Sequence, residues 1–558
     1  MKRKKAYGLT AVILIALLCL STAGCARNPK EQTQAAGGTE EPARTQEQQT
    51  QESAQQSENG GEEIGYPLTT GDSLSIWCMN QLNPASVYAD YTESPFHMKL
   101  AENTGVDVEW MYPAKGADAV QAYHLLLTEE ELPDMIFTSI GSDEADLLID
   151  DGLIYDLTEY IPRYAPDYWN YISAPGNEEL LRSVKTDKER LFNFATFLQE
   201  DYNRTYVGPA IRKDWLEECG LDEPVTLDDW ETVLTAFKEK YNATFGFFTA
   251  RLDNIGIGSG TGAYGTFKGS MYVDDMGKVQ YAQVQPEWKE YMEVLHRWYD
   301  MGLIDKDSVT MDDAAVRTKV LNNEIGISFT ALSQITNWMM DAQAEGTGAQ
   351  WGGIEYPRTA PGEPTCMIQT QNSYMGWGAM VTTSCPEDKL ITALKWLNYG
   401  YSEEGLVYWN YGTEGETFIL DDNGIPQWTD LILNDADGLG LACAKYTGTN
   451  GTGISIQQSQ QVRLRNSQES VDAVYKWIEN TNAQQHFMPP VGLTEEESVR
   501  YTDKMTAINT RVQEMGLKFM TGDESLAQFD AFVEELNGMG LEECLDIMQA
   551  AYDRYMSK

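Results

Sequence analysis

The residue types that commonly carry enzyme chemistry occur in this sequence, but their spacing matches no catalytic motif. No Gly-x-Ser-x-Gly elbow is present, and no cysteine has a nearby histidine that would suggest an activated thiol. The four histidines are scattered singly, without a His-Glu-x-x-His pair, at His97, His124, His296 and His486. With 86 acidic residues, chance pairs of carboxylates are unavoidable and identify no glycosidase site. The sequence therefore predicts no catalytic residue, no cofactor and no metal site.

Two glycine-containing segments could in principle bind phosphate or calcium, but their surroundings favour other structures. GIGSGTGAYG (Gly256–Gly265) lacks the strand, helix and acidic residue of a dinucleotide fingerprint. It continues into two predicted short strands around a DDMG turn, and we interpret it as a surface loop that lets Tyr264 approach a ligand. DDNGIPQW (Asp421–Trp428) lacks the alternating oxygens and final Glu of an EF-hand, and its Asn-Gly predicts a hairpin.

Cys25 is the residue whose surroundings predict a covalent modification. Basic residues at positions 2–5 and an apolar stretch over 9–20 form a secretory signal. Two small residues directly before the cysteine resemble the bacterial lipobox, in which the thiol is diacylated and the chain is cut just before it. Two acyl chains hold a protein stably on a membrane. We predict a signal peptide over 1–24, although Thr22 stands where lipoboxes favour leucine. The alternative is a signal peptide cut elsewhere.

Residues 25–65 predict a disordered tether, because they are rich in Gln, Glu, Ser, Thr and Gly and contain one large aliphatic residue, Ile64. Cleavage before Cys25 removes four basic and no acidic residues, which takes the formal charge from −46 to −50. Such a charge argues against nucleic acid as a ligand. No apolar run after Leu20 is long enough for a transmembrane helix.

The body from about Tyr66 to Lys558 has the pattern of an α/β protein with helical additions at its end. Short strands predicted at 73–77, 106–110 and 134–137 alternate with helices, which indicates a parallel sheet. Amphipathic helices are predicted at 226–241, with Thr226 and Asp229 close to a capping box, and at 287–302. Further predicted elements are buried strands at 324–330 and 379–383, and C-terminal helices at 525–536 and 541–556.

Six cysteines of the body permit up to three disulfides, with 15 full connectivities, and spacing favours neither bridges nor free thiols. They are Cys78, Cys219, Cys366, Cys385, Cys443 and Cys544.

Several segments together resemble extracellular solute-binding protein family 1, the substrate-binding lipoproteins of ABC-type carbohydrate importers. The resemblance covers about 490 residues, essentially the whole mature body, and the last segment is similar to the large Firmicute lipoproteins of the group. The segments are YVGPAIRKDWLEECGLDEPVTLDDWETVLTAFKEK (Tyr206–Lys240), LNNEIGISF (Leu321–Phe329), CPEDKLITALKWLNYGYSEEGLVYWNYGTEGETFILDDNG (Cys385–Gly424) and FMTGDESLAQFDAFVEELNGMGLEECLDIMQAAYDRY (Phe519–Tyr555).

The resemblance implies an α/β, two-lobed periplasmic-binding-protein fold (type II, maltose-binding-protein-like) that closes over its ligand by hinge motion. The implied first lobe comprises 66–195 with 376–480, and the second comprises 196–375 with 481–558. Oligo-alginate-type relatives carry a calcium loop after the helix that here ends in FKEKY, whereas this chain continues NATFGFFTA. This departure again predicts no calcium site.

A sugar site needs aromatic platforms for C–H faces and polar groups for hydroxyls, and in α/β sheets it lies at the carboxyl ends of strands. The residues that follow predicted strands are Asn80, Gln81, Thr138, Ser139, Thr330 and Ser333, with Trp338 in the helix beyond. The resemblance adds Arg204, Tyr206, Tyr374 and Trp377. Asp214 and Trp215 are assigned to structure.

We therefore expect a lipid-anchored protein on the extracellular face of a Gram-positive type of cell membrane, which captures a carbohydrate and delivers it to ABC transporter permease subunits. The size of the chain favours an oligosaccharide, and we expect a monomer that touches the membrane through its lipid alone. The alternatives are a surface-anchored glycoside hydrolase or lyase, and an adhesive surface lipoprotein.

Overall fold

The short apolar strands predicted near the amino terminus lie in the first of the two large sheets of the described residues. The computed structural model describes residues 63–79, 88, 91–114, 116–246, 271–363, 369–370, 372–448, 453–479 and 481–558. Within these residues the first sheet has six strands in the order β15-β4-β12-β3-β1-β2. They are β1 (Ser73–Cys78), β2 (Asp107–Met111), β3 (Met135–Ser139), β4 (Phe194–Leu198), β12 (Tyr374–Val381) and β15 (Ile456–Gln457).

The direction of these strands confirms the predicted parallel core of the sheet. β1 pairs in parallel with β2 and β3, whereas β12 runs antiparallel to both β3 and β4. β12 begins earlier than the strand predicted at 379–383, because Tyr374 already pairs with Phe197 of β4. Strand β3 is buried along most of its length, since helices cover both faces of the sheet.

The helices around the first sheet are α2 (Pro95–Thr104), α3 (Ala119–Leu126), α4 (Ser142–Asp150), α5 (Ile161–Tyr164), α6 (Pro166–Ile172), α7 (Glu178–Ser183), α14 (Glu387–Tyr399) and α15 (Glu403–Tyr411). The predicted hairpin is confirmed, because β13 (Phe418–Leu420) pairs with β14 (Pro426–Trp428), and the Asp421 carboxylate accepts the turn N–H groups of Asn423 and Ile425. The hairpin leads into α16 (Asp430–Leu433) and α17 (Leu439–Tyr446).

The second sheet has five strands in the described part of the chain, in the order β10-β5-β9-β6, with β11 also paired to β5. They are β5 (Thr205–Arg212), β6 (Thr244–Gly246), β9 (Ile325–Ala331), β10 (Trp351–Gly353) and β11 (Gln369–Thr370). The helices packed around it are α9 (Lys213–Cys219), α10 (Leu227–Tyr241), α11 (Pro286–Asp300), α12 (Asp313–Leu321), α13 (Leu332–Glu345) and α19 (Gln468–Ile478).

Local sequence explains why these elements form where they do. Helix α10 confirms its prediction, with a reciprocal capping box between Thr226 and Asp229. The structural roles assigned to Asp214 and Trp215 are also confirmed. Arg212 donates to both carboxylate oxygens of Asp214, at 2.8 and 2.6 Å, and lies 4.0 Å above the Trp215 ring. These contacts hold α9 against the end of β5.

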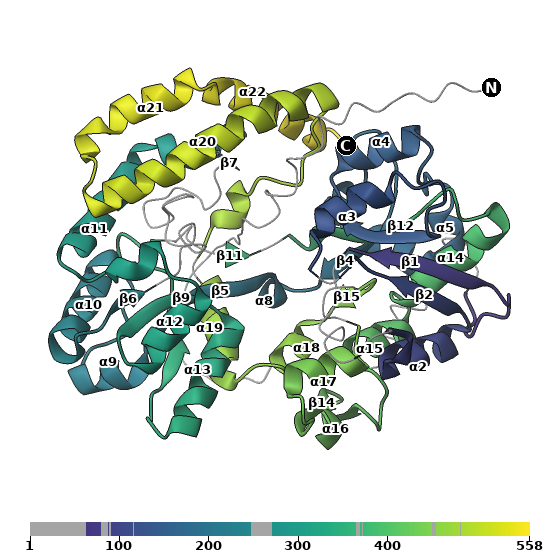
Figure 1. Ribbon diagram of the computed structural model, residues 1–558, viewed down its shortest axis with the longest axis horizontal. Helices are drawn as coiled ribbons and strands as arrows, with labels where there is room; N and C mark the ends of the chain where they lie inside the picture. The colour runs from purple at the N-terminus through teal and green to yellow at the C-terminus, as the bar shows by residue number, and fades with distance from the viewer. Residues whose placement is uncertain are drawn as a thin grey trace, which may run out of the picture.

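The described chain passes between the two sheets at three places. β4 leads through α8 (Asp201–Arg204) into β5, β11 of the second sheet precedes β12 of the first, and β15 leads through α18 (Ser459–Arg463) to α19. Figure 1 shows α8 between the two lobes. The crossings are joined to one another, because Asn203 donates to the Gln457 carbonyl at 2.6 Å and the Arg463 guanidinium lies 4.7 Å over the Tyr202 ring.

The C-terminal helices form a layer on the second lobe, along the upper edge of Figure 1. The layer comprises α20 (Glu495–Thr521), α21 (Phe529–Gly538) and α22 (Leu541–Met556), and it packs on α11 and on the hairpin of β7 (Met271–Val273) and β8 (Val279–Tyr281). Trp288 of α11 is fully buried there against Phe519, Phe529 and Phe532. The predicted strands around the DDMG turn and the predicted C-terminal helices are confirmed.

Candidate ligand-binding site

Four of the predicted ligand residues meet at one edge of the first sheet. β3 and β4 run in the same direction, because both are antiparallel to β12, so their carboxyl ends lie beside the amino end of β12. The register pairs Trp377 with Ser139 and Gly378 with Thr138. Tyr374 is the first residue of β12, three residues before Trp377, and therefore lies further toward this edge. The sequence thus located this edge, although it could not show that β12 completes it.

The side chains at this edge differ in their freedom to reach a ligand. Trp377 is half-buried, with its ring stacked on Phe137 at 5.7 Å between centroids. Ser139 is also half-buried, and its Oγ lies where a Cβ on Gly376 would approach to 3.0 Å. Gly376 has a φ of +82°, so glycine suits both the conformation and the space. Ser139 and Trp377 are therefore the better-exposed polar and aromatic groups of the predicted four.

Thr138 and Tyr374 are held inside the protein. Thr138 is 2% exposed and its hydroxyl donates to the Met79 sulfur at 3.0 Å. The Tyr374 hydroxyl accepts from the Asn193 amide at 2.9 Å, and burial raises the pKa of Tyr374 to about 12. Both side chains support the edge from behind.

A second group of predicted residues meets at one edge of the other sheet. β9 ends where antiparallel β5 begins, with Val207 paired to Ala331, so Tyr206 and Thr330 share that edge. Thr330 is buried and Tyr206 is half-buried, whereas Ser333 is exposed in the first turn of α13. Arg204 ends α8 just before this edge and pairs with Asp201 at 3.3 Å.

The two edges face one another because all three crossings leave from them. β4 and β15 end at the first edge and β12 begins there, while β5 begins and α13 starts at the second. Connections this short require adjacent edges, with α8 between them as Figure 1 shows. A ligand held here would contact both lobes, in the position that open α/β sheets offer at their strand ends.

Trp338 lies elsewhere, in the core of the second lobe. Its side chain is 2% exposed and packs against Trp351 of β10, with 4.7 Å between ring centroids. Its position follows from α13, which turns this face of the helix toward β10 rather than toward the first lobe.

The first edge also carries two carboxylates that the sequence analysis did not single out. α4 begins just after β3, and its first turn contains Asp143 and Glu144. Burial raises the pKa of both carboxyl groups, that of Glu144 to about 7, although Tyr123 donates to Glu144 at 3.0 Å. Near neutral pH Glu144 can thus be either a donor or an acceptor for a hydroxyl. The sequence signal for these two carboxylates was the segment SDE, residues 142–144, shortly after the buried strand.

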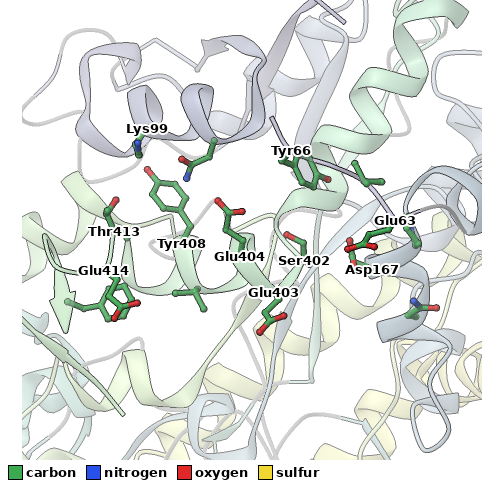
Figure 2. A pocket seen from close by; sticks show the side chains of 17 residues that line it. Glu63, Tyr66, Lys99, Asp167, Ser402, Glu403, Glu404, Tyr408, Thr413 and Glu414 are labelled. Atoms are coloured by element: carbon green, nitrogen blue, oxygen red, sulfur yellow. The ribbon is translucent and has the colours of Figure 1, made fainter. Parts of the chain in front are cut away.

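A separate pocket of about 880 Å³ lies on the first lobe, between the segment before β1 and helices α2, α6 and α15. Figure 2 shows its labelled carboxylates spread along the groove, with Lys99 at one end and Glu63 at the other. Of the described residues that line it, five are acidic and one is a lysine. None of the predicted ligand residues that the structure describes lines this pocket. The lining residues are Glu63, Ile64, Tyr66, Lys99, Asn103, Pro166, Asp167, Asn170, Ser402, Glu403, Glu404, Val407, Tyr408, Gly412, Thr413, Glu414 and Phe418.

Other predictions lie outside the described residues, namely those on Cys25, Asn80, Gln81 and Tyr264. Of the six cysteines of the body, Cys366 also lies outside the described residues, and the other five are free thiols, namely Cys78, Cys219, Cys385, Cys443 and Cys544. Across the described ranges, no cluster of His, Cys, Asp and Glu has the arrangement of a metal site. Nor does any helix in those ranges combine the length and the apolar character needed to cross a membrane.

Two α/β lobes joined by three crossings, with facing strand edges and a helical C-terminal layer, give the architecture of a two-lobed solute-binding protein. The sequence agrees, because residues 87–406 match the family described as bacterial extracellular solute-binding protein. The chain belongs to this family, and it is accordingly a binding protein rather than an enzyme. This confirms the family resemblance and the two-lobed fold.

Curated relatives cover most of the chain at low identity. Lipoprotein LipO of Bacillus subtilis is 23% identical over 482 residues, which is 82% of this chain and 89% of LipO. The fructooligosaccharide ABC transporter substrate-binding protein FusA of Streptococcus pneumoniae is 22% identical over 523 residues, which is 89% of this chain and 93% of FusA. The matched family is described as extracellular, and the relatives of this chain include one named as a lipoprotein and one named as a sugar-transporter component.

Among solved structures, an HMO-binding, ABC-transporter-associated solute-binding protein from Bifidobacterium longum infantis superposes with a TM-score of 0.68. The two chains are 19% identical, and the match covers 87% of this chain and 99% of the other. At this identity the likeness shows the fold alone.

Proposed function

We propose that this protein is a lipid-anchored receptor that captures an oligosaccharide between its two lobes and delivers it to the permease of an ABC importer. The observation that carries the proposal is the pair of facing edges, one of which presents the half-buried Trp377 ring beside Ser139. The oligosaccharide named for FusA and the HMO named for the Bifidobacterium protein support a sugar of more than one unit.

Within this site we propose direct ligand contacts for Trp377, Ser139, Tyr206, Ser333 and Arg204. The aromatic rings offer platforms for the C–H faces of a sugar, and the hydroxyls and the guanidinium offer hydrogen bonds to its rim. The side chains of Thr138, Tyr374 and Thr330 are buried, so we propose that they position the contact residues and do not touch the ligand themselves. Asn80, Gln81 and Tyr264 stay predictions, and for Trp338 the buried contact with Trp351 supports a role in packing instead.

The direct test is calorimetric titration of the purified protein with fructooligosaccharides, HMO and alginate oligosaccharides, with monosaccharides as controls. We expect micromolar or tighter binding of one oligosaccharide class and at least about tenfold weaker binding of its monosaccharides, because only a longer ligand contacts both edges. Hydrolysis of the bound sugar, or the absence of binding across the panel by a folded protein, would contradict the proposal.

We also propose lipid attachment at Cys25, with residues 25–65 as a tether, as the sequence predicts. The lipoprotein name of LipO supports an anchor in this family. Cys25→Ala is expected to release the protein into the medium or leave it unprocessed, since two acyl chains supply stable membrane attachment. The measurement is fractionation of cells with and without detergent. A shortened Cys25→Ala protein that still needs detergent for extraction would refute the anchor.

For the lobes we propose the predicted division with its last boundary placed near 468. The first lobe then comprises 66–195 with 376–467, and the second comprises 196–375 with 468–558. The packing of α19 on β5 and β10 supports this placement, as does the packing of α20 on α11.

A further inference from the structure

The C-terminal helical layer is fastened to the second lobe along its length. Val279 of β8 donates its N–H to Gln549 of α22 at 2.7 Å, and Gln549 donates back to the Gly277 carbonyl at 3.1 Å. Tyr281 donates to Asn509 of α20 at 3.1 Å. Together with the buried aromatic contacts around Trp288, these bonds make the layer move with the second lobe.

The far end of the same layer contacts the first lobe. Lys558 lies 2.8 Å from the Asp187 carboxylate with its side chain 5% exposed, and Arg554 lies 3.6 Å from the other oxygen. Tyr555, 1% exposed, donates to Glu179 of α7. Just before α20, the chain passes so close to α4 that a Cβ on Gly492 would meet Ser142 Oγ at 2.2 Å. Figure 1 accordingly shows the C-terminus beside α4.

The partners on the first lobe belong to a rigid part of it. The turn that carries Asp187 is tied to α4, because Arg190 pairs with Asp146 and with Asp150 at 2.8 Å, and Lys188 also pairs with Asp150. α4 follows directly from β3, which lies inside the first sheet. Asp187 therefore moves together with the rest of the first lobe.

We propose that this contact is a latch between the lobes, in which Lys558, Arg554 and Tyr555 of the second lobe's helical layer hold Asp187 and Glu179 of the first lobe. In Figure 1 the contact lies on the opposite side of α8 from α18, so opening the lobes about the crossings would separate it. The latch favours the closed arrangement before any ligand binds. It rests on the proposed function, because closure over a ligand is what it would regulate.

The composition of the contact suits a latch that can release. Two of its charged side chains are partly exposed, Arg554 at 34% and Asp187 at 23%, whereas Lys558 is 5% exposed. A partly exposed ion pair shifts an equilibrium by about five-fold or less. Salt weakens such pairs further. The contact can therefore bias the lobes toward closure and still open when the complex meets its permease.

The test uses the full-length mature protein without sugar. Lys558→Glu and Asp187→Lys each place like charges in the contact, whereas the double variant restores an opposite pair with reversed polarity. Lys518→Glu is the matched control, because this substitution makes the same change of charge in the same layer. Lys518 pairs with Glu514 inside α20 and takes no part in the contact between the lobes. Small-angle scattering reports the separation of the lobes, and amide exchange reports the protection of residues 178–187.

We expect each single variant to increase the radius of gyration and to accelerate exchange over 178–187 by about two- to five-fold, with recovery in the double variant. The control should match the unmodified protein, and 1 M NaCl should accelerate the same amides in the unmodified protein, which requires no variant to fold. Unchanged scattering and exchange in both single variants, or no effect of salt, would overturn the latch. Because no sugar is used, failure of the latch and failure of sugar binding are separate results.

Discussion

Replacing Trp377 by alanine is expected to weaken oligosaccharide binding by about ten- to a hundredfold. The ring stacks on Phe137 and lies beside Ser139 at the edge that faces the second lobe. An aromatic platform of this kind contributes both buried area and stacking against the C–H face of a sugar, and alanine removes both. Calorimetric titration with the oligosaccharide class that the unmodified protein binds measures the effect.

Two variants make the Trp377 experiment specific. Trp377→Phe keeps an aromatic face and should recover much of the affinity. Trp338→Phe changes the same residue type in the core, where Trp338 packs on Trp351, and should leave the affinity within about twofold. If folded Trp377→Ala binds as tightly as the unmodified protein, this edge does not form the sugar platform.

Replacing Trp477 by alanine is expected to lower the free energy of unfolding by about 3–5 kcal/mol. Trp477 of α19 is fully buried and donates its indole N–H to the Pro209 carbonyl of β5 at 3.0 Å. The indole lies directly on Gly208, where a Cβ would come within 2.4 Å of it. Alanine would leave a cavity at the place where the third crossing enters the second lobe, and the Pro209 carbonyl would keep only the N–H of Ile354, at 3.1 Å, as its donor. Urea unfolding followed by circular dichroism measures the loss.

The matched control is Asp472→Ala, an exposed position on the same helix, which should change the free energy by no more than about 0.5 kcal/mol. Gly208→Ala approaches the same contact from the strand and should also destabilise, because the indole must move. A loss below about 1 kcal/mol for Trp477→Ala would mean that α19 is not held by this contact.

Much of the fold could be predicted where the signals are local. The apolar strand at 73–77, the capping box of Thr226 and Asp229, and the Asn-Gly turn after Asp422 each specify structure within a few residues. The parallel core could be predicted as well, because strands and helices alternate at the spacing of that architecture.

The rest depends on contacts between distant segments. Ile456 and Gln457 were not predicted as a strand, and their partners Phe197 and Leu198 in β4 lie far away in the chain. Trp338 and Trp377 look alike in the sequence. Only the packing of β10 against α13 shows that Trp338 is internal. Only the pairing of β12 with β3 shows that Trp377 lies beside Ser139 at the edge of the sheet. The contact between Lys558 and Asp187 joins residues 371 apart and leaves no trace in either neighbourhood.

The interleaved strand order of the first sheet has a consequence for how the newly made chain folds. β3 and β4 are separated by β12, and β4 has β15 on its other side, yet both partners come from much later in the chain. A chain that is exported amino end first presents β3 and β4 with unpaired edges until the whole second sheet and the segment to Gln457 have followed. Such edges invite pairing between chains. The first lobe to emerge is therefore completed only after every strand of the second sheet, and secretion yield is the property most exposed to delays in translocation.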